Sequence, residues 1–362
     1  MSKIRVLVVE DSLTVRARLV EVLSADPGIQ VVGEAADGKT AIELCQQLRP
    51  DVVTLDMLLP LLSGLAVTEY IMAYCPTPIL IVSCSVNRGT VYKTYDALAS
   101  GALEVLEKPR GDEMDGVWER TFVSTVKLVS RVKVITHVRG RQQNVSKLPL
   151  PSVESGSYRL VAIGASTGGP VALLEILQSL PPDFPIPILV VIHIGEAFGT
   201  LLAEWLDNQS RLRVSCAVDG EPLPAVGHPR VILAPPGRHL VVSCGHLHLT
   251  DFSERNSCRP SVDVLFESVA REIGPQSIAC LLTGMGRDGA QGLLAIRRAG
   301  GRTLAQDQAT STIFGMPDEA IRMGAAERIL DLHEVAPALV ALAGTAARSA
   351  LVPVTSVDKQ SG

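Results

Sequence analysis

Residues Val161–Pro170 read VAIGASTGGP, and this stretch decides the fold of the second half of the chain. An apolar strand runs into a glycine-rich turn with Ser166 at its apex, and Pro170 then opens a helix with apolar periodicity. A strand–Gly-x-Ser-x-Gly–helix turn lifts a hydroxyl clear of the backbone and directs nearby N–H groups at whatever that hydroxyl attacks. The stretch therefore predicts an α/β domain with a reactive serine at one edge of its sheet.

Short apolar strands alternate with amphipathic helices along most of the chain, which is typical of parallel sheets with right-handed crossovers. We therefore predict an α/β fold with two doubly wound domains and mainly parallel sheets. The first domain is expected at 1–125, a helix end and linker at 126–157, the second domain at 158–345 and a flexible tail at 346–362. The linker is inferred from lost apolar periodicity and from the Ser, Gln, Pro and Gly residues between Arg139 and Ser157.

The apolar runs locate the strands and the last helix. In the first domain we expect strands at 4–9, 30–34, 51–55, 78–83 and 103–106, with a closing helix within 117–138. In the second domain we expect them at 159–163, 188–192, 230–234, 278–283 and 302–305. A last helix is predicted over Val335–Ala343, before the small-residue tail.

The composition is that of a folded protein with little affinity for nucleic acid. A chain of 362 residues with 47% hydrophobic and 20% charged residues can bury two cores. Its net charge of -5 offers no basic surface to a phosphate backbone. The seven scattered cysteines contain no C-x-x-C pair and read as buried thiols in a reducing compartment. Without a signal peptide or an apolar run of membrane-spanning length, we expect a cytoplasmic protein with no membrane insertion.

Acidic side chains gather where strands of the first domain are expected to end. Glu10 and Asp11 follow the first strand and Asp56 follows the third, and open parallel sheets bind ligands beyond these carboxyl ends. Three carboxylates in one crevice repel each other unless a hard cation joins them, and Mg²⁺ prefers such oxygen ligands. Ser83 and Lys108, at the ends of the next two strands, add a hydroxyl and a cation that suit a phosphoryl group. Each residue alone is an ordinary polar strand cap, but the ordered set predicts one site.

This set resembles the receiver domain of two-component response regulators, which has a flavodoxin-like fold, over roughly residues 1–125. The resemblance implies that Asp56 accepts a phosphoryl group from a histidine kinase. It also implies that Glu10, Asp11 and Asp56 bind Mg²⁺. Ser83 would contact the phosphoryl oxygens, and Lys108 would pair with them.

Two positions depart from the receiver pattern. The family usually has an acidic residue or Asn and then Met-Pro after the phosphorylated aspartate, whereas here the run is Met57-Leu58-Leu59-Pro60. Because the metal contact at Leu58 is expected from its backbone carbonyl, this change need not abolish binding. Val105 occupies the place where the family commonly has an aromatic switch residue. The strength of phosphorylation control is therefore open.

In the second domain, a serine nucleophile needs a base and the base needs an orienting acceptor. His193 directly follows the apolar strand Ile188–Ile192, and Asp288 lies on the glycine-rich turn Thr283–Gly289 after a later strand. The ends of neighbouring parallel strands meet at one edge, so we expect both side chains to lie near Ser166. The glycines allow backbone N–H groups to approach an oxyanion closely.

These residues alone leave alternatives open. His239 is a rival base and Asp307 a rival carboxylate. The order Ser…His…Asp differs from the Ser…Asp…His of α/β-hydrolases, which makes that family a poor match. The turn Gly164–Gly169 would also suit a nucleotide phosphate, although His193 stands where a ribose-binding acid is expected. A non-catalytic signalling adaptor is a further alternative, and a DNA-binding output is disfavoured because the second half has no basic recognition helix.

Ordered stretches of the second domain are similar to the chemotaxis protein-glutamate methylesterases, which are also protein-glutamine glutaminases. The similar stretches are 164–170, 192–193, 234–239, 259–263, 282–289, 305–311 and 315–317. The resemblance implies a Rossmann-like serine hydrolase domain with Ser166 as nucleophile, His193 as general base and Asp288 as orienting carboxylate. The backbone around Thr167 and Met285 would help form the oxyanion site.

The resemblance also implies a substrate, partners and a mode of control. The enzyme would remove methyl esters from glutamates of methyl-accepting chemoreceptors, and deamidate specific glutamines, without a cofactor for the hydrolase chemistry. A chemotaxis histidine kinase would phosphorylate Asp56 with Mg²⁺, which would loosen a receiver that otherwise covers the Ser166 crevice. After His193 the family commonly has an exposed Met and a Pro, where this chain has Ile194-Gly195-Glu196-Ala197. We expect that loop to border the substrate.

Overall fold

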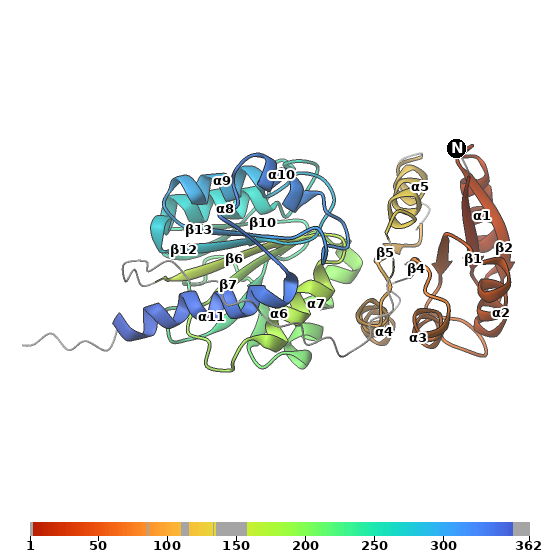
Figure 1. The fold of residues 1–362 in the computed structure, drawn as a ribbon, viewed down its shortest axis with the longest axis horizontal. Helices are drawn as coiled ribbons and strands as arrows, with labels where there is room; N and C mark the ends of the chain where they lie inside the picture. Colours follow the sequence, from red (N-terminus) through yellow and green to blue (C-terminus); the bar gives the residue numbers. More distant parts are fainter. Residues whose placement is uncertain (1–2, 85–86, 110–115, 133, 135–157, 350–362) are drawn as a thin grey trace, which may run out of the picture.

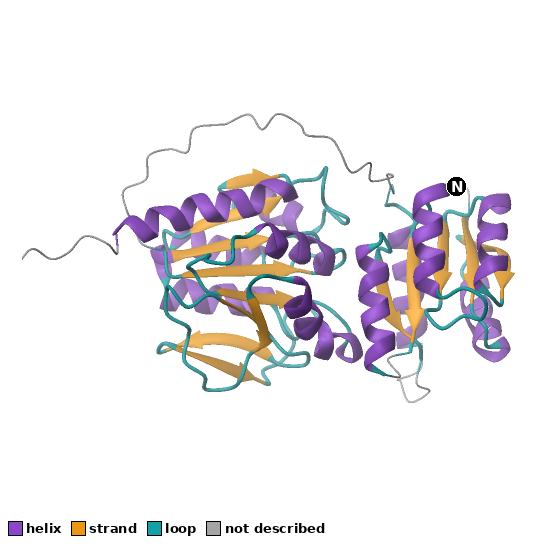
Figure 2. Ribbon diagram, turned by 90° about the horizontal axis from the view of Figure 1, so that it is seen from below, coloured by secondary structure: helices purple, strands orange, loops and turns teal. Residues whose placement is uncertain are grey.

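The computed structural model describes residues 3–84, 87–109, 116–132, 134 and 158–349. These residues form two α/β domains side by side (Figure 1), each built on a twisted sheet with helices on both faces (Figure 2). The predicted fold class of two doubly wound parallel-sheet domains is confirmed. The predicted linker and tail fall mostly on residues 135–157 and 350–362, which lie outside the described residues.

The first domain is a five-stranded parallel sheet in the order β2-β1-β3-β4-β5. Its strands are β1 (Ile4–Val9), β2 (Ile29–Ala35), β3 (Val52–Leu55), β4 (Ile79–Ser83) and β5 (Glu104–Glu107). Its helices are α1 (Leu13–Ser24), α2 (Gly38–Leu48), α3 (Gly64–Tyr74), α4 (Arg88–Ala99) and α5 (Val117–Val129). Helices α1 and α5 cover one face of the sheet, and α2, α3 and α4 cover the other. The central strands are mostly apolar because both of their faces are buried over most of their length.

The second domain is a seven-stranded parallel sheet in the order β14-β13-β12-β6-β7-β9-β8. Its strands are β6 (Leu160–Ala165), β7 (Ile188–Ile192), β8 (Arg213–Cys216), β9 (Arg230–Leu233), β12 (Ser277–Leu281), β13 (Arg302–Gln306) and β14 (Arg328–Leu330). A separate antiparallel hairpin joins β10 (His239–Ser243) to β11 (His246–Thr250). The chain leaves β6 in one direction and returns through β12 on its other side, so the sheet has its switch point between β6 and β12. Open α/β sheets bind ligands at such a point.

The helices of the second domain form two layers. Helices α6 (Gly169–Ser179), α7 (Glu196–Gln209) and α11 (Leu332–Ser349) pack on one face of the sheet. Helices α8 (Val262–Glu272), α9 (Ala290–Arg298) and α10 (Met316–Arg322) pack on the other, and a single 3₁₀ turn covers Gly274–Gln276. Within the described ranges, every helix is too short or too polar to cross a bilayer.

The structure differs from the sequence expectations at several secondary elements. The edge strands β8 and β14, the hairpin β10–β11 and helix α10 were not predicted. The short segments β8, β14 and α10 carry little apolar periodicity. The last helix begins at Leu332 and continues to Ser349, beyond the predicted range. The loop expected to border the substrate is shorter than predicted, since α7 already begins at Glu196.

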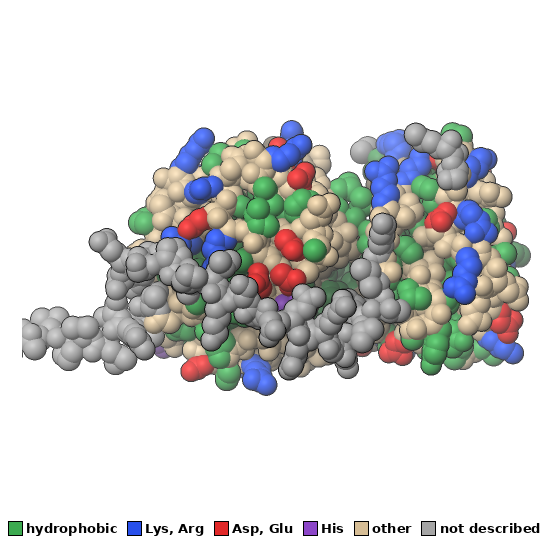
Figure 3. Space-filling view, in the orientation of Figure 1, with side chains coloured by type: hydrophobic (Ala, Val, Ile, Leu, Met, Phe, Trp, Pro, Cys, Tyr) green, Lys and Arg blue, Asp and Glu red, His purple; other side chains and the backbone are tan. Residues whose placement is uncertain are grey.

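The two domains are in contact through α4 of the first and α7 of the second. The rings of Tyr95 and Trp205 lie 5.1 Å apart, and Trp205 Nε1 donates a hydrogen bond to Asp96 Oδ1 at 3.1 Å. The Tyr95 hydroxyl donates to the backbone carbonyl of Phe198. Tyr95 and Phe198 are both fully buried and belong to one continuous apolar cluster. On the face shown in Figure 3 the two lobes are separated by a notch, so the domains dock over part of their facing surfaces.

Candidate active site

Ser166 and His193 sit side by side at the ends of neighbouring strands. In the β6–β7 ladder Ala165 pairs with Ile192, so the next residue of each strand is the serine or the histidine. The His193 N–H donates to the Ala165 carbonyl at 3.0 Å, and the Ser166 N–H donates to the carbonyl of Thr283 beyond β12 at 3.0 Å. The serine is therefore held at the switch point of the sheet, where its side chain is half-exposed.

Two glycines let the chain turn tightly around this serine. Gly168 has φ +76°, a left-handed conformation that favours glycine, and it precedes α6. At Gly284 a Cβ would come within 2.7 Å of the Ser166 Cβ. Each glycine-rich stretch thus contains a position next to Ser166 where the backbone conformation or the available space favours glycine.

His193 and Asp288 form a direct pair. The His193 Nε2 lies 2.9 Å from Asp288 Oδ2, and the carboxylate is almost fully buried. Asp288 also accepts hydrogen bonds from Ser261 Oγ at 2.7 Å and from the Val262 N–H at 2.6 Å. Asn256 Nδ2 donates to the same carboxylate at 3.0 Å. Since Ser261 is the N-cap of α8, the carboxylate lies at the positive end of that helix.

These contacts shift the pKa of both partners in opposite directions. Burial favours neutral Asp288, but hydrogen bonds from His193, Asn256 and Ser261 outweigh it and lower its pKa to about 2. Burial also disfavours protonated His193, but its hydrogen bond to Asp288 outweighs this and raises its pKa to about 9. The carboxylate is thus ionised over the working pH range and holds the imidazole in one orientation and tautomer, as a catalytic orienting group does.

The serine and the histidine are adjacent but not hydrogen-bonded to each other among the described residues. With Nε2 engaged by Asp288, the ring atom left to act as base is Nδ1. That atom lies 3.7 Å from the thiol sulfur of Cys258. The hydrogen bond between a catalytic serine and its histidine is often long or absent before substrate binds. Cys258 is only partly buried and Cys244 is exposed, so the expectation that all cysteines are buried thiols is wrong.

The backbone groups predicted for the oxyanion site flank the serine from two turns. Thr167 follows Ser166, and its carbonyl accepts from Thr283 Oγ1 at 2.9 Å. Met285 lies on the turn after β12 with 54% of its surface exposed. Neither the Thr167 N–H nor the Met285 N–H donates a hydrogen bond to another described residue. Both groups remain available to an oxyanion.

The rival residues lie in structural positions. His239 is fully buried, with Nε2 3.2 Å from the Ser253 carbonyl and Nδ1 accepting from the Ser261 N–H at 3.1 Å. Asp307 accepts hydrogen bonds from the N–H and the hydroxyl of Thr310 within its own turn. Neither contacts His193, so the geometry favours Asp288 as its partner.

The acidic residues of the first domain converge as the strand ends predict. One carboxylate oxygen from each of Glu10, Asp11 and Asp56 lies within 4.8 Å of the others. Lys108 Nζ lies 2.7 Å from Glu10 Oε2 and 2.8 Å from Asp56 Oδ2. Ser83 Oγ donates to Asp56 Oδ1 at 3.0 Å. Hard oxygen donors at this spacing fit Mg²⁺.

The charges of this site are coupled. Burial raises the pKa of Glu10, and the hydrogen bond from Lys108 partly offsets this. Burial disfavours the charged form of Lys108, but its hydrogen bonds to Asp56 and Glu10 raise its pKa above the ordinary value. At the two departures from the receiver pattern, Leu58 is exposed and Val105 is buried.

A side chain of the first domain reaches the serine turn of the second. Glu104, at the start of β5, accepts a hydrogen bond from the Thr167 hydroxyl and another from the Val105 N–H at 3.0 Å. Burial raises the pKa of Glu104, and these two hydrogen bonds only partly offset the shift. The residue next to Ser166 is thus in contact with the other domain.

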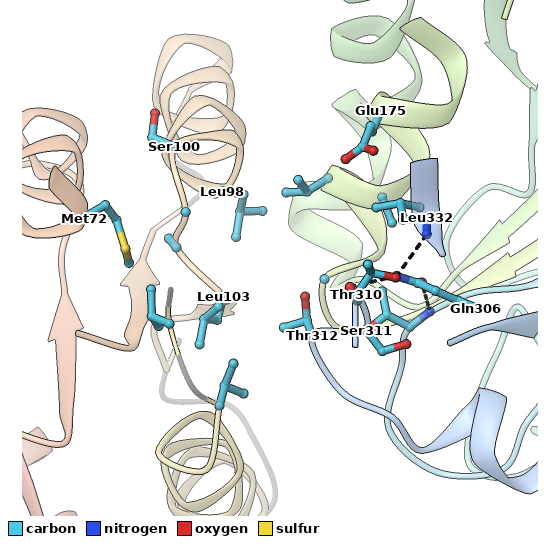
Figure 4. Close-up of a pocket in the computed structure, with 18 of the residues that line it drawn as sticks. Met72, Leu98, Ser100, Leu103, Glu175, Gln306, Thr310, Ser311, Thr312 and Leu332 are labelled. Atoms are coloured by element: carbon cyan, nitrogen blue, oxygen red, sulfur yellow. Dashed lines mark hydrogen bonds between the residues drawn. The ribbon is translucent and has the colours of Figure 1, made fainter. Parts of the chain in front are cut away.

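A cavity of about 530 Å³ separates the domains beside this contact (Figure 4). Leu98 and Leu103 line it from the first domain, and Thr312 faces them from the second. Gly168 and Thr283, which flank the serine turn, belong to the same lining. The approach to Ser166 from this side is therefore enclosed by both domains.

Several residues of the site were not identified from the sequence. They are Glu104, Asn256 and Cys258, together with Ser261, which the sequence indicated only as part of the similar stretch 259–263. Ser261 carried a detectable signal, because a serine directly before an apolar-periodic helix predicts an N-cap. The other residues carry no local pattern that predicts their contacts.

A phosphoacceptor-like receiver followed by a doubly wound domain with serine, histidine and aspartate at its strand ends defines a response regulator with a serine hydrolase output. Residues 161–339 match the family described as CheB methylesterase, and residues 6–115 match the response regulator receiver domain. The chain belongs to the CheB methylesterase family. The predicted family resemblance is thereby confirmed for both domains.

The relatives match over nearly their full length. Protein-glutamate methylesterase/protein-glutamine glutaminase 2 of Anaeromyxobacter dehalogenans (strain 2CP-C) is 45% identical over 336 residues, 93% of this chain and 96% of the relative. Protein-glutamate methylesterase/protein-glutamine glutaminase 4 of Myxococcus xanthus (strain DK1622) is 43% identical over 342 residues, which cover 93% of this chain and 96% of the relative. The crystal structure of the Thermotoga maritima CheB methylesterase catalytic domain is 37% identical, covers 52% of this chain and 100% of that chain, and has a TM-score of 0.49.

Proposed function

We propose that Ser166, His193 and Asp288 hydrolyse γ-methyl esters of glutamate on methyl-accepting chemoreceptors. The observation that carries this assignment is the buried His193–Asp288 pair at 2.9 Å beside the serine turn. Ionised Asp288 stabilises the imidazolium that forms when the histidine takes a proton. The cytoplasmic bundle of such receptors would be the substrate, which places the reaction in the cytoplasm.

The reaction proceeds through an acyl-enzyme. Ser166 Oγ attacks the ester carbonyl carbon while His193 Nδ1 takes the hydroxyl proton. The N–H groups of Thr167 and Met285 donate to the resulting oxyanion. As the intermediate collapses, the C–O bond to the methoxy group breaks and His193 returns the proton, which releases methanol. Water then attacks the acyl-enzyme by the same route and frees glutamate and Ser166.

Deamidation of specific glutamines follows the same path. An amide passes through a similar tetrahedral oxyanion, and the proton from His193 leaves with ammonia in place of methanol. Neither reaction requires a metal or cofactor in the second domain, since the nucleophile, base and oxyanion donors all come from the chain.

Control of this site is proposed to come from Asp56. Its carboxylate attacks the phosphorus of a phosphohistidine on a chemotaxis histidine kinase, so an O–P bond forms as the N–P bond breaks. When held by Glu10, Asp11 and Asp56, Mg²⁺ supplies positive charge beside the phosphoryl oxygens. Lys108 then exchanges its contact with the Asp56 carboxylate for the phosphoryl group, and Ser83 donates to it.

The link from the phosphate to the serine runs through the docked domains. Ser83 ends β4 and its carbonyl accepts from the Lys108 N–H at 3.1 Å, next to β5. The same strand β5 carries Glu104, which contacts Thr167. Rearrangement of these strand ends on phosphorylation would loosen the contact beside Ser166 and open the cavity to substrate.

The test is methanol release from methylated receptor, with and without Mg²⁺ and a small phosphodonor. We expect release by the unaltered chain that rises with the donor, no release by Ser166→Ala, and unchanged release by Ser253→Ala, whose side chain is exposed. Release that requires Ser166 but ignores the donor would support the esterase and contradict the control by Asp56. No release from several receptors, even with the donor, would contradict the esterase and favour a signalling adaptor.

A further inference from the structure

The proposed hydrolysis leaves one chemically active group beside the catalytic histidine without a role. Cys258 Sγ lies 3.7 Å from His193 Nδ1, and both residues are partly exposed. The cysteine sulfur, a ring nitrogen of the histidine and an oxygen of Asp288 all lie within 4.8 Å of one another. Sulfur, nitrogen and oxygen donors gathered at this spacing are a set that borderline-soft divalent metals favour.

The spacing of the sulfur and the nitrogen matches a shared metal ion. A tetrahedral zinc site with Zn–S of about 2.3 Å and Zn–N of about 2.0–2.1 Å places the two ligand atoms about 3.6 Å apart. The Sγ and Nδ1 atoms of Cys258 and His193 are 3.7 Å apart. The separation of these two atoms is therefore that of two ligands of one zinc ion.

The second ring nitrogen already has the partner that a metal-bound histidine requires. His193 Nε2 lies 2.9 Å from Asp288 Oδ2, so in the neutral imidazole the proton is held there and the Nδ1 lone pair faces the sulfur. A carboxylate that accepts the other N–H of a ligating histidine is the usual outer partner at zinc sites. Asp288 is itself fixed by Ser261 and by the Val262 N–H at the start of α8. The arrangement is therefore preorganised for binding through Nδ1.

We propose that Cys258 and His193 form a binding site for Zn²⁺ or a similar borderline-soft divalent metal, and that the bound metal inhibits the esterase. Binding takes up Nδ1, the atom that accepts the Ser166 proton, and releases the Nδ1 proton of protonated His193 together with the thiol proton of Cys258. Two protein ligands leave the other coordination positions to water, which makes the inhibition reversible by a chelator. The inhibitory part rests on the proposed function, whereas binding of the metal does not.

The test uses the full-length chain in excess Mg²⁺, which keeps the hard oxygen donors of the receiver occupied. Co²⁺ serves as the spectroscopic probe, because a bound thiolate gives a charge-transfer absorption in the near ultraviolet. We expect this band in the unaltered chain and in Cys244→Ser, whose cysteine is exposed and outside the site, and its loss in Cys258→Ser. For each variant, methanol release is expressed as a fraction of its own zinc-free rate. The Zn²⁺ concentration that halves this release should be at least about tenfold higher in Cys258→Ser than in the unaltered chain, and unchanged in Cys244→Ser.

The outcomes separate the two proposals. Absence of the Co²⁺ band in the unaltered chain, or its persistence in Cys258→Ser, would overturn the metal site. A Cys258-dependent band without inhibition by Zn²⁺ would overturn the inhibitory role. A Cys258-dependent band in a protein that hydrolyses no ester would support the metal site and contradict the proposed function.

Discussion

Replacing Tyr95 with Phe tests whether the docked arrangement of the domains restrains the enzyme. The Tyr95 hydroxyl donates across the interface to the Phe198 carbonyl, from a fully buried position. Burial raises the pKa of Tyr95, so its hydroxyl stays a donor over the working pH range. Tyr95→Phe keeps the ring that packs 5.1 Å from Trp205 and removes only this hydrogen bond.

The size of the effect follows from the hydrogen bond that is lost. A neutral hydrogen bond contributes about 1 kcal/mol net, and leaving its buried partner unpaired adds to the loss. In the undocked form the hydroxyl bonds to water, so the substitution weakens docking and little else. A shift of about 1 kcal/mol changes the docking equilibrium about fivefold, since about 1.4 kcal/mol corresponds to tenfold. The unstimulated rate should therefore rise about fivefold.

The assay compares methanol release with and without the phosphodonor. In Tyr95→Phe the unstimulated rate should rise while the rate at saturating donor stays the same, because the stimulated form is already undocked. The matched control is Tyr74→Phe, which removes a hydroxyl from a side chain that is 71% exposed. An unstimulated rate that does not change, or a fall of both rates together, would refute the reasoning.

Three further predictions concern the site itself. Catalysis needs neutral His193, whose pKa is raised to about 9, so kcat/KM should rise with pH up to that value. In Asp288→Asn the pH–rate profile should shift toward pH 6.5 and kcat should fall on the order of 10⁴-fold; an unshifted profile would contradict the pairing. Ser261→Ala removes the N-cap of α8 and a hydrogen bond to Asp288. It should lower the free energy of unfolding, measured in urea, by about 1 kcal/mol and should also lower kcat. A loss of stability with unchanged kcat would limit Ser261 to a structural role. Burial raises the pKa of the Glu104 carboxyl, which contacts Thr167 of the other domain, so its protonated form should favour docking and the docked state should weaken as pH rises above the ordinary value. Glu104→Gln should lower the unstimulated rate and remove this part of its pH dependence; a higher rate would mean that the charge itself stabilises docking.

The positions of the candidate catalytic side chains could be predicted because strand ends obey a simple geometric rule. Ser166, His193 and Asp288 each follow an apolar run, and the carboxyl ends of neighbouring parallel strands meet at one edge of the sheet. The same rule predicted that Asp56 and Lys108 lie close together, and Lys108 Nζ is 2.8 Å from Asp56 Oδ2. Because both faces of the sheet are buried, its central strands are continuous apolar runs that can be recognised in the sequence.

The supporting residues could not be predicted because their contacts depend on how distant segments pack. Asn256 and Cys258 lie on the loop before α8, and no periodic pattern relates that loop to His193 or Asp288. Tyr95 in an amphipathic helix reads as an ordinary core residue, although its partner belongs to another domain. The hairpin was a missed signal, since His246–Thr250 alternates polar and apolar side chains in the manner of a strand.

The contact between α4 and α7 joins two parts of one polypeptide. Docking is therefore a unimolecular equilibrium, whose position does not depend on how much of the protein a cell contains. A separate inhibitor subunit would dissociate on dilution and would have to be made in proportion to the enzyme. Because the Tyr95–Trp205 pair lies within one chain, the fraction of docked molecules should be the same at low and high abundance of the protein.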